Sequence, residues 1–290
     1  MTYTDTLAAA AVKVAASLGV YATDPVILAN GANVIVHLSP APVVAKVAAS
    51  TPAVRPDNAA WLQRELDVVR FLAGRGVPVM TPSPEVPPVV HHGDGQVMSF
   101  WRYLSPIPGR PGEETIGSML RDLHAELRGY PAQLPFLAPL GDIPAFLSRP
   151  QTRLTASQAA ALAAAHARLT AHLAPDQSLH GDAGDGNLMA TGAGWVWHDF
   201  EDTCTGPVAW DLAASTASPR LDGARILAAY GENPAQLEVC QQLRKLHLTV
   251  LYNLLPNGCR ISLPAPPNSS PCGRCPEPVT PAWPAWSQRV

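Results

Sequence analysis

Short apolar and alternating runs dominate the first third of the chain. Residues 24–50 (DPVILANGANVIVHLSPAPVVAKVAAS) hold three β-rich runs separated by Asn-Gly and Ser-Pro turn pairs. Residues 57–77 carry apolar side chains at helical spacing, and Asp57 is suited to cap the start of that helix. Residues 87–104 predict a hairpin that turns at Gly-Asp-Gly. This part therefore predicts a small antiparallel sheet with a helix, preceded by an amphipathic helix over residues 1–20.

Helical spacing takes over beyond residue 105. Residues 115–127 place five apolar side chains on one helix face, and residues 155–173 predict an alanine-rich helix. Further helices are predicted over residues 210–255. The chain is therefore predicted to be an α+β protein with two lobes, a small antiparallel-sheet lobe over residues 1–105 and a larger helical lobe over residues 106–256.

Residues 257–290 differ from the rest of the chain. They are rich in proline and lack the periodicity of a helix or a strand, so we expect a disordered tail without a packed core. Cys272 and Cys275 have the C-x2-C spacing that makes half of a zinc site. No second pair follows, and an incidental pair of cysteines is the alternative.

The charge and the apolar content of the chain argue against a nucleic-acid-binding, a membrane-spanning or a secreted protein. The net charge is −3 and no basic stripe stands out, which disfavours nucleic acid as a partner. No run of about 18 strongly apolar residues predicts a membrane span, and the amino terminus lacks the basic region of a secretory signal. The five cysteines fit a reducing compartment. We therefore expect a cytoplasmic protein, whose oligomeric state the sequence leaves open.

Two neighbouring segments concentrate carboxylates in a chain with only 15% charged residues. They are HGDAGDGNLM, residues 180–189, and WVWHDFEDT, residues 195–203. Like charges held together need a cation, a proton to move or full exposure to water. A solvated loop with capping acids, a single-cation site and a two-metal hydrolase site are the open interpretations. The hydrolase site would draw its ligands from His180, Asp182, Asp185, His198, Asp199 and Glu201.

A predicted hairpin favours the single-cation site. Thr-Gly-Ala-Gly is a natural turn, and pairing Ala190 with Trp195 around it brings Asn187 beside Asp199 at the open end. An amide oxygen and a carboxylate about 5 Å apart across a hairpin suit one Mg²⁺ ion. Asp182 precedes Asn187 by five residues, so its carboxylate can lie near the metal and accept a proton.

Lys46 lies alone among the apolar residues of VVAKV. One explanation is an edge-strand lysine that prevents aggregation. Glu65 favours another, because it lies near the middle of the apolar face of its helix, where a carboxylate needs a partner. We predict that Lys46 is this partner, since a strand lysine held by a helix glutamate grips nucleotide phosphates in kinases. A metal-dependent hydrolase would need neither residue.

Taken together, these segments resemble the aminoglycoside phosphotransferase and choline kinase family, which has the protein-kinase-like fold. The resemblance lies within residues 25–215 and is carried by NGANVIV, VVAKV, RELDVVRFL, LRDLHAEL, LHGDAGDGNLM, WVWHDFEDTCTGP and WDLA. The most specific part is His-Gly-Asp-x4-Asn followed by a strand and Asp-Phe-Glu. The resemblance implies two lobes with the active site between them.

The resemblance also implies roles for the acidic cluster. Asp182 would be the catalytic base, and His180 would orient the loop that carries it. Asn187 and Asp199 would bind Mg²⁺. Asp211 would brace the catalytic loop, although capping the following helix is an alternative.

For the nucleotide, the resemblance implies that Lys46, positioned by Glu65, contacts the α- and β-phosphates of ATP. The hairpin over residues 30–38 would cover the phosphates, and the backbone between residues 99 and 103 would hold the adenine. The residues expected to bind the nucleotide are Lys46, Glu65, Gly31, Asn33, Ser99, Trp101 and Tyr103.

The function expected from this reasoning is an ATP- and Mg²⁺-dependent phosphotransferase that acts on a hydroxyl group of a small molecule. The expected acceptor is an aminoglycoside or an amino alcohol. Two alternatives remain. One is a kinase-like nucleotide-binding protein whose turnover is impaired by its atypical carboxyl-terminal end. The other is a metal-dependent hydrolase.

Overall fold

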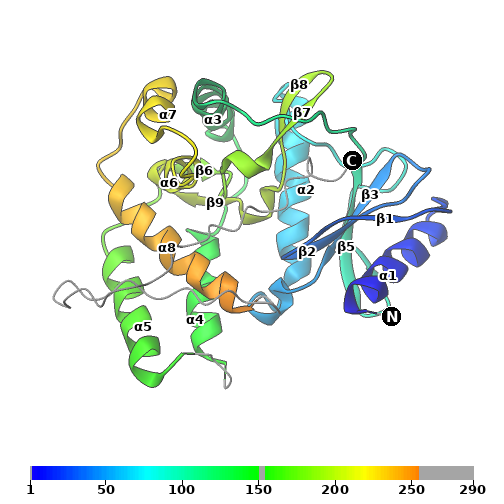
Figure 1. The fold of residues 1–290 in the computed structure, drawn as a ribbon, viewed down its shortest axis with the longest axis horizontal. Coiled ribbons are helices and arrows are strands. Elements are labelled where there is room, and N and C mark those ends of the chain that lie inside the picture. Colours follow the sequence, from blue (N-terminus) through cyan, green and yellow to red (C-terminus); the bar gives the residue numbers. More distant parts are fainter. Residues whose placement is uncertain (1, 150–153, 255–290) are drawn as a thin grey trace.

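The computed structural model describes residues 2–149 and 154–254, which form two lobes (Figure 1). The predicted α+β, two-lobed architecture is confirmed. The predicted tail, with Cys272 and Cys275, lies outside the described residues. No helix in the part of the chain that the structure describes is long and apolar enough to cross a membrane.

The amino-terminal lobe is built on a five-stranded antiparallel sheet with the strand order β1-β2-β3-β5-β4. Its strands are β1 (Val26–Asn30), β2 (Asn33–His37), β3 (Val43–Ala48), β4 (His91–Gly93) and β5 (Gln96–Arg102). Helices α1 (Tyr3–Ser17) and α2 (Asn58–Gly74) pack against this sheet. The predicted cap of α2 is confirmed, because the Asp57 side chain accepts a hydrogen bond from the Ala60 amide at 3.1 Å.

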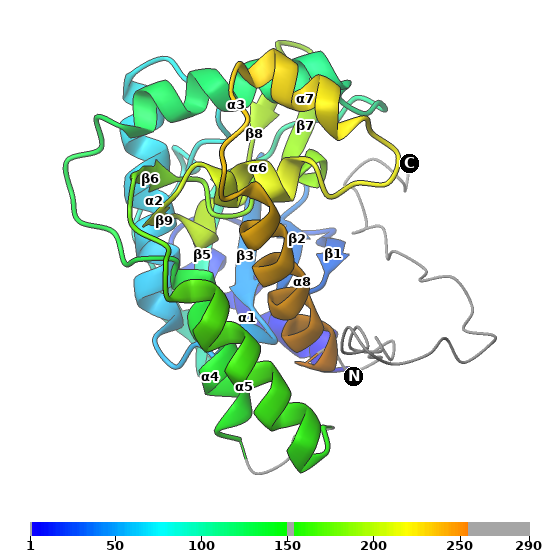
Figure 2. The same cartoon turned by 90° about the vertical axis from the view of Figure 1, so that its left-hand side faces the viewer.

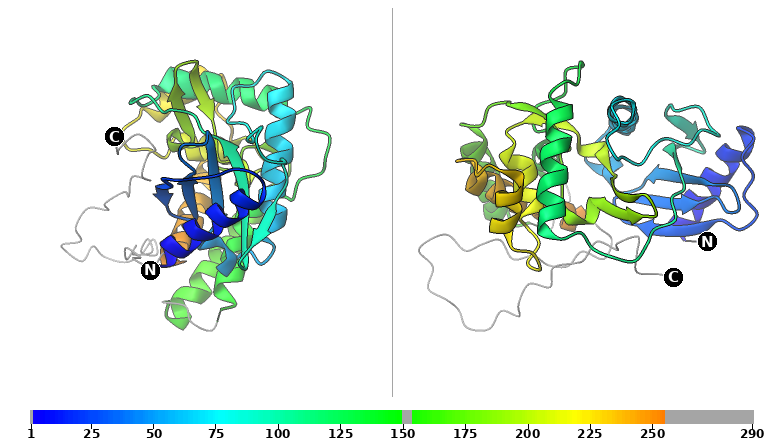
Figure 3. Two further views of the ribbon diagram at one scale, coloured as in Figure 1. Left: turned by 90° about the vertical axis from the view of Figure 1, so that its right-hand side faces the viewer. Right: turned by 90° about the horizontal axis from the view of Figure 1, so that it is seen from above.

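Strand β3 is central and buried along its whole length. Because successive side chains of a strand point to opposite faces, Val43, Ala45 and Val47 share one face. They pack in a cluster with Leu7 and Ala10 of α1, which lies across the outer side of the sheet (Figure 3). Val44 packs with α2 instead. The same alternation sends Lys46 toward α2 and the second lobe.

The carboxyl-terminal lobe is mainly helical. Its helices are α3 (Glu113–Leu127), α4 (Asp142–Leu147), α5 (Ala156–Thr170), α6 (Ala209–Ser215), α7 (Gly223–Tyr230) and α8 (Leu237–Leu254). The apolar face predicted for α3 is confirmed, with four of its side chains buried and Met119 partly buried. Helix α4 was not predicted from the sequence. Helix α8 runs beside α4, α5 and α6 (Figure 2).

Two short sheets hold the acidic segments in place. Strand β6 (Gln177–Leu179) pairs with β9 (Cys204–Gly206), and β7 (Leu188–Thr191) pairs with β8 (Gly194–Trp197). The second pair is the predicted hairpin, and its register is confirmed, with Ala190 opposite Trp195. The His198 amide donates to the Asn187 carbonyl at 3.0 Å, which continues the pairing beyond the strands.

The lobes are joined by backbone pairing as well as by apolar packing. The segment after α2 runs parallel to β8, where the Trp197 amide donates to the Pro78 carbonyl and the Met80 amide donates to the Trp197 carbonyl. One apolar cluster includes Val44 from the first lobe and Trp197 from the second. The pairing of residues 78–80 with Trp197 therefore fixes the distance between the five-stranded sheet and the β7–β8 hairpin.

Gly117 provides a test of how α3 packs against α7. A β-carbon at this position would collide with the Ile226 carbonyl oxygen and lie 2.7 Å from the Ala229 β-carbon. Helix propensity alone predicts that alanine stabilises a helix by about 1 kcal/mol relative to glycine. We expect Gly117→Ala to lower the thermal midpoint instead, because two backbones must separate.

Gly74→Ala is the matched control, since Gly74 also lies in a helix but its β-carbon would meet nothing within 4 Å. This variant should be neutral or more stable in thermal unfolding. Equal midpoints for the two variants would contradict the close packing of α3 on α7.

Candidate active site

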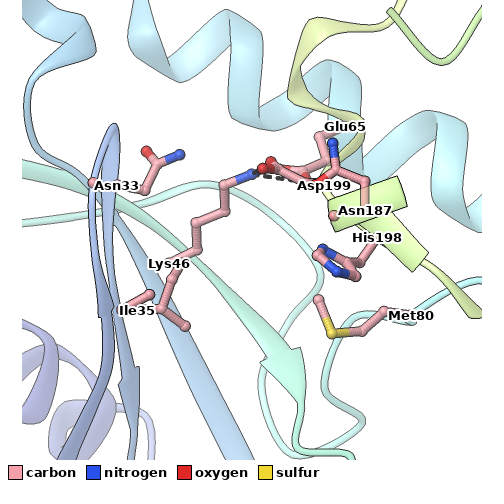
Figure 4. A pocket seen from close by; sticks show the side chains of 11 residues that line it. Asn33, Ile35, Lys46, Glu65, Met80, Asn187, His198 and Asp199 are labelled. Carbon is pink, nitrogen blue, oxygen red and sulfur yellow. Dashed lines mark hydrogen bonds and ion pairs between the residues drawn. The ribbon is translucent and has the colours of Figure 1, made fainter. Parts of the chain in front are cut away.

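The predicted partnership of Lys46 and Glu65 is confirmed. The Lys46 Nζ atom lies 2.9 Å from Oε2 and 3.0 Å from Oε1 of Glu65, and both side chains are buried (Figure 4). The same Glu65 carboxylate accepts a hydrogen bond from the Phe200 amide at 3.0 Å. Strand β3, helix α2 and the segment after β8 therefore meet at one carboxylate.

Two further carboxylates surround the same ammonium group. Lys46 Nζ lies 2.5 Å from Oδ1 of Asp199 and 3.1 Å from Oε2 of Glu201. Burial disfavours the charged form of Lys46, but Asp199, Glu201 and Glu65 outweigh it and raise its pKa well above the usual value. Burial also opposes the ionisation of Asp199, yet Lys46 holds the pKa of that carboxyl below its usual value.

The site carries more carboxylates than cations. Lys46 and Arg55 face five of them, from Glu65, Asp142, Asp199, Glu201 and Asp202. Burial, reinforced by the Glu201 charge, raises the pKa of Asp202 to about 6 even though Arg55 opposes this shift. A site with such an excess of negative charge is suited to a divalent cation.

Asp211 organises the loop that carries Asp182. Its Oδ2 accepts the His180 amide at 2.8 Å and its Oδ1 accepts the Gly181 amide at 2.9 Å. Burial opposes the ionisation of Asp211, but hydrogen bonding to His124, at 2.9 Å, holds its pKa below the usual value. A buried carboxylate on two backbone amides fixes the path of a loop.

Gly181 occupies a position that only glycine fits. Its φ angle is +90°, in the left-handed region, and a β-carbon would collide with the Asp202 backbone. The close approach brings residues 180–182 against residues 199–202. The sharp turn at Gly181 thus lets two acidic segments share one site.

His180 is buried, and both of its ring nitrogens are engaged. Nε2 lies 3.1 Å from the His198 carbonyl oxygen, and Nδ1 accepts the Asp182 amide at 3.2 Å. Burial lowers the pKa of His180, which favours the neutral ring that these contacts require. Its nitrogens are therefore unavailable as metal ligands, and they orient the loop.

Asn187 links the loop to the hairpin. Its Nδ2 donates to the Asp182 carbonyl at 2.7 Å and to the Asp182 Oδ2 at 3.1 Å. This arrangement uses the amide nitrogen and leaves the amide oxygen as the group available to a cation.

Asp199 has a backbone conformation that is rare outside glycine, with a φ angle of +65°. Such strain persists only where surrounding contacts enforce it, and it concentrates at functional sites. The carboxylate is about one-third exposed, at 31%, and Lys46 uses one of its oxygens. An amide oxygen from Asn187 and a carboxylate from Asp199 fit the oxygen-donor set that Mg²⁺ prefers. No group of three His, Cys, Asp or Glu ligands suited to a metal occurs in residues 2–149 and 154–254.

One pocket brings together six of the residues predicted to bind the nucleotide or the metal (Figure 4). They are Gly31, Asn33, Lys46, Glu65, Asn187 and Asp199. The rest of the lining is Ala29, Ile35, Met80, Gly186 and His198. The pocket thus lies between strands β1–β3 of the first lobe and the acidic hairpin of the second.

Ser99 and Trp101 of strand β5, and Tyr103 just after it, do not line the pocket. Ser99 and Trp101 are buried within the lobe, where the Trp101 indole donates to the Ser99 hydroxyl at 2.9 Å. Tyr103 stacks on the His37 ring with centroids 3.8 Å apart. The Phe100 carbonyl accepts from Ser83, and the Arg102 and Tyr103 amides donate to other carbonyls. Much of this backbone is therefore committed to the sheet and its neighbours.

Two buried arginines at the site were not predicted. Arg55 binds Asp142 through Nε and Nη2 and also approaches Glu201 and Asp202. Arg244, in α8, lies 2.6 Å from Oδ1 of Asp182.

A sequence signal existed for Arg244. It lies on the apolar face of α8, four residues after the buried Cys240 and beside the buried Leu243. A charged residue at such a position needs a buried partner, which is the reasoning that identified Glu65. No comparable periodicity marks Arg55, because it lies between a 3₁₀ turn and α2.

Comparisons with known proteins agree with this geometry. The sequence model of a family described as "Phosphotransferase enzyme family" matches residues 29–246. A search of curated protein sequences finds no match.

Several solved structures have a similar fold. An amicoumacin kinase in complex with AMP-PNP, Ca²⁺ and amicoumacin has a TM-score of 0.64 at 13% identity, over 82% of this chain and 84% of its own. The choline kinase LicA from Streptococcus pneumoniae has a TM-score of 0.58 at 13% identity, over 83% and 88%. The GDP and kanamycin complex of APH(2")-IIia has a TM-score of 0.55 at 15% identity, over 83% and 88%. The protein-kinase-like fold predicted from the sequence is confirmed.

Asp211→Ala should destabilise the protein strongly. The change leaves two buried amides and His124 without their acceptor, which costs roughly 3 kcal/mol in free energy of unfolding. Urea denaturation measures the loss. Asp122→Ala is the control, because Asp122 is 71% exposed and pairs only with its neighbour Arg121 among the described ion pairs. Similar stabilities for the two variants would contradict a bracing role.

Proposed function

Because the chain belongs to the phosphotransferase enzyme family, we propose that it transfers the γ-phosphoryl group of ATP to a hydroxyl group of a small molecule. Of the described residues, those up to 105 would form the nucleotide-binding lobe and those from 106 to 254 the catalytic lobe. The observation that carries the proposal is the convergence of Lys46, Glu65, Asn187 and Asp199 on one pocket from both lobes. A phosphate-binding cation and a metal-binding pair in the same cleft are the elements that phosphoryl transfer needs.

Asp182 acts as the catalytic base. Its Oδ2 takes the Asn187 amide at 3.1 Å, and the carboxylate is 37% exposed, so an acceptor hydroxyl can reach it. The transition state of phosphoryl transfer is loose, so the carboxylate mainly orients the hydroxyl and takes its proton as the new P–O bond forms. His180 keeps the loop in the required conformation.

Asn187 and Asp199 would hold Mg²⁺ through their side-chain oxygens. When bound, the ion neutralises charge on the nucleotide phosphates and offsets the excess of carboxylates around Lys46. Both residues line the pocket, and the family's fold is found with AMP-PNP and Ca²⁺ in the amicoumacin kinase complex.

Lys46 binds the α- and β-phosphates while Glu65 holds its side chain from behind. The β1–β2 hairpin covers the phosphates, and its residues Gly31 and Asn33 line the pocket. Ala29, Ile35 and Met80 supply apolar lining for the adenine ring. Hydrogen bonding of adenine by the backbone between residues 99 and 103 stays a prediction.

The acceptor is an aminoglycoside or an amino alcohol. The acids Asp185, Glu201 and Asp202, close to Asp182 or Asp199 in the sequence, favour a cationic acceptor over an anionic one. The structures with a similar fold include an amicoumacin kinase, a kanamycin complex and a choline kinase. Engagement of both His180 nitrogens disfavours a two-metal hydrolase.

The deciding experiment is a screen for ADP release from ATP and Mg²⁺ with kanamycin, amicoumacin, choline and ethanolamine as acceptors. Acceptor-dependent ADP release supports the proposal. ATP binding without release, for every acceptor, would favour a nucleotide-binding protein with impaired turnover. Release of phosphate from phosphoesters without ATP would favour the hydrolase.

Asp182→Asn should retain ATP binding and lose transfer by about 10²–10⁴-fold, because it removes the proton acceptor and keeps the shape of the side chain. Calorimetric ATP affinity and acceptor-dependent ADP release measure the two effects. Near-normal turnover in this variant would overturn the assignment of the base.

Asp199→Ala should weaken Mg²⁺-dependent ATP binding more severely than Asn187→Ala, because it removes a charged ligand. Titration of ATP with and without Mg²⁺ separates the metal-dependent part of the affinity. Asp185→Ala is the control, since Asp185 is paired with Arg220 at 2.7 Å instead. If all three variants lose the same affinity, the assignment of the metal ligands is wrong.

A further inference from the structure

Arg244 of helix α8 contacts the oxygen of Asp182 that Asn187 does not. Building on the proposed function, we propose that Arg244 is a positioning residue of the active site. It holds the Asp182 carboxylate in the orientation that accepts the proton of the acceptor hydroxyl. The proposal assigns a part in the reaction to a residue of α8, far along the chain from the catalytic loop.

Each of the three nitrogens of the Arg244 guanidinium contacts either the loop that carries Asp182 or Trp210 of α6. Nη1 lies 2.6 Å from Oδ1 of Asp182, and Nη2 donates to the Gly181 carbonyl at 2.5 Å. Nε donates to the Trp210 carbonyl at 3.4 Å. The planar fork of arginine suits such a set of acceptors, and lysine could not reproduce it.

The guanidinium is held in place before any substrate binds. Arg244 is only 7% exposed, and its Cζ lies 4.2 Å from the centroid of the Trp210 ring. The Trp210 indole itself donates to the Gly181 carbonyl at 2.8 Å. Cys240 and Leu243, beside Arg244 on α8, are buried in the same cluster as Trp210. The side chain is therefore part of a packed interface between α6 and α8.

The consequence is a carboxylate fixed at both oxygens. Asn187 donates to Oδ2 at 3.1 Å and Arg244 binds Oδ1 at 2.6 Å. A carboxylate with one partner can rotate about its terminal bond, whereas partners on both oxygens define its plane. Each oxygen still has a lone pair free for the acceptor hydroxyl.

Orientation of this kind matters for phosphoryl transfer. The protein does little covalent chemistry in such a reaction, so its contribution is mostly positioning and electrostatics. Loss of Arg244 should therefore slow transfer without weakening nucleotide binding, because Lys46, Asn187 and Asp199 remain.

A purely structural role is the competing explanation, since Arg244 also binds two carbonyl oxygens. Three variants separate the explanations. Arg244→Met keeps the length and removes the charge, and Arg244→Lys keeps the charge and loses the fork. Arg220→Met is the matched control. It also removes an arginine–aspartate pair, but the aspartate is Asp185, three residues after Asp182.

The assay measures ADP release from ATP in the presence of Mg²⁺. It is run with whichever of kanamycin, amicoumacin and choline supports transfer, and also without an acceptor, where water takes the phosphoryl group. We expect Arg244→Met to lower kcat by about 10–100-fold and to leave the KM for ATP unchanged. Arg244→Lys should recover part of the lost rate. Arg220→Met should have the same kcat as the wild type. Thermal midpoints of all variants show whether each is folded at the assay temperature.

A double-mutant cycle with Asp182→Asn decides whether Arg244 acts through the base. If it does, Arg244→Met should cause little further loss of kcat in the Asp182→Asn background. A full and multiplicative loss in that background would overturn the proposal, as would unchanged or increased kcat in the single variant. A wild type without transfer or ATP hydrolysis would instead overturn the proposed function, and this inference with it.

Discussion

The buried ammonium group of Lys46 is the point on which the arrangement of the lobes depends. Its three carboxylate partners come from helix α2 and from the segment that follows β8. A lysine buried to 5% exposure is costly unless its charge is compensated. Separation of the lobes would leave Lys46 and Glu65 without Asp199 and Glu201. The contacts of Lys46 with these carboxylates therefore also keep the five-stranded sheet close to the β7–β8 hairpin.

A second set of buried polar contacts ties the helical lobe to this point. Asp142 of α4 binds both Arg55 and His247, and Arg55 continues to Glu201. Helix α8 presents Arg244 and His247 three residues apart, so they lie on the same face of the helix. Arg244 contacts Asp182, and His247 contacts Asp142 of α4. Helix α8 thus contacts Asp182 directly and is linked to Lys46 through Asp142, Arg55 and Glu201.

The features that were predictable depend on short-range geometry. The turn in residues 191–194 defined the register of its hairpin, because strand pairing has a period of two. The position of Glu65 on an apolar helix face required a buried cation, and Lys46 was the nearest such residue on a predicted strand. Hydrogen bonding of adenine by the backbone between residues 99 and 103 depends on contacts of longer range. A strand pattern indicates which residues alternate, but not which backbone groups neighbouring segments such as residues 81–83 will use.

The sequence by itself determined the residue types of the site, the face on which each lies, and the local pairing that sets Asn187 beside Asp199. These follow from periods of 2 and 3.6 residues, which act over a few residues only. Tertiary structure alone decided the pairings of acids with bases that lie far apart in the sequence. Lys46 and Asp199 are 153 residues apart and Asp182 and Arg244 are 62 apart. Such pairs form only after apolar packing has placed whole helices and sheets, because the attraction between two charges is short-ranged in water and strong only once both are buried.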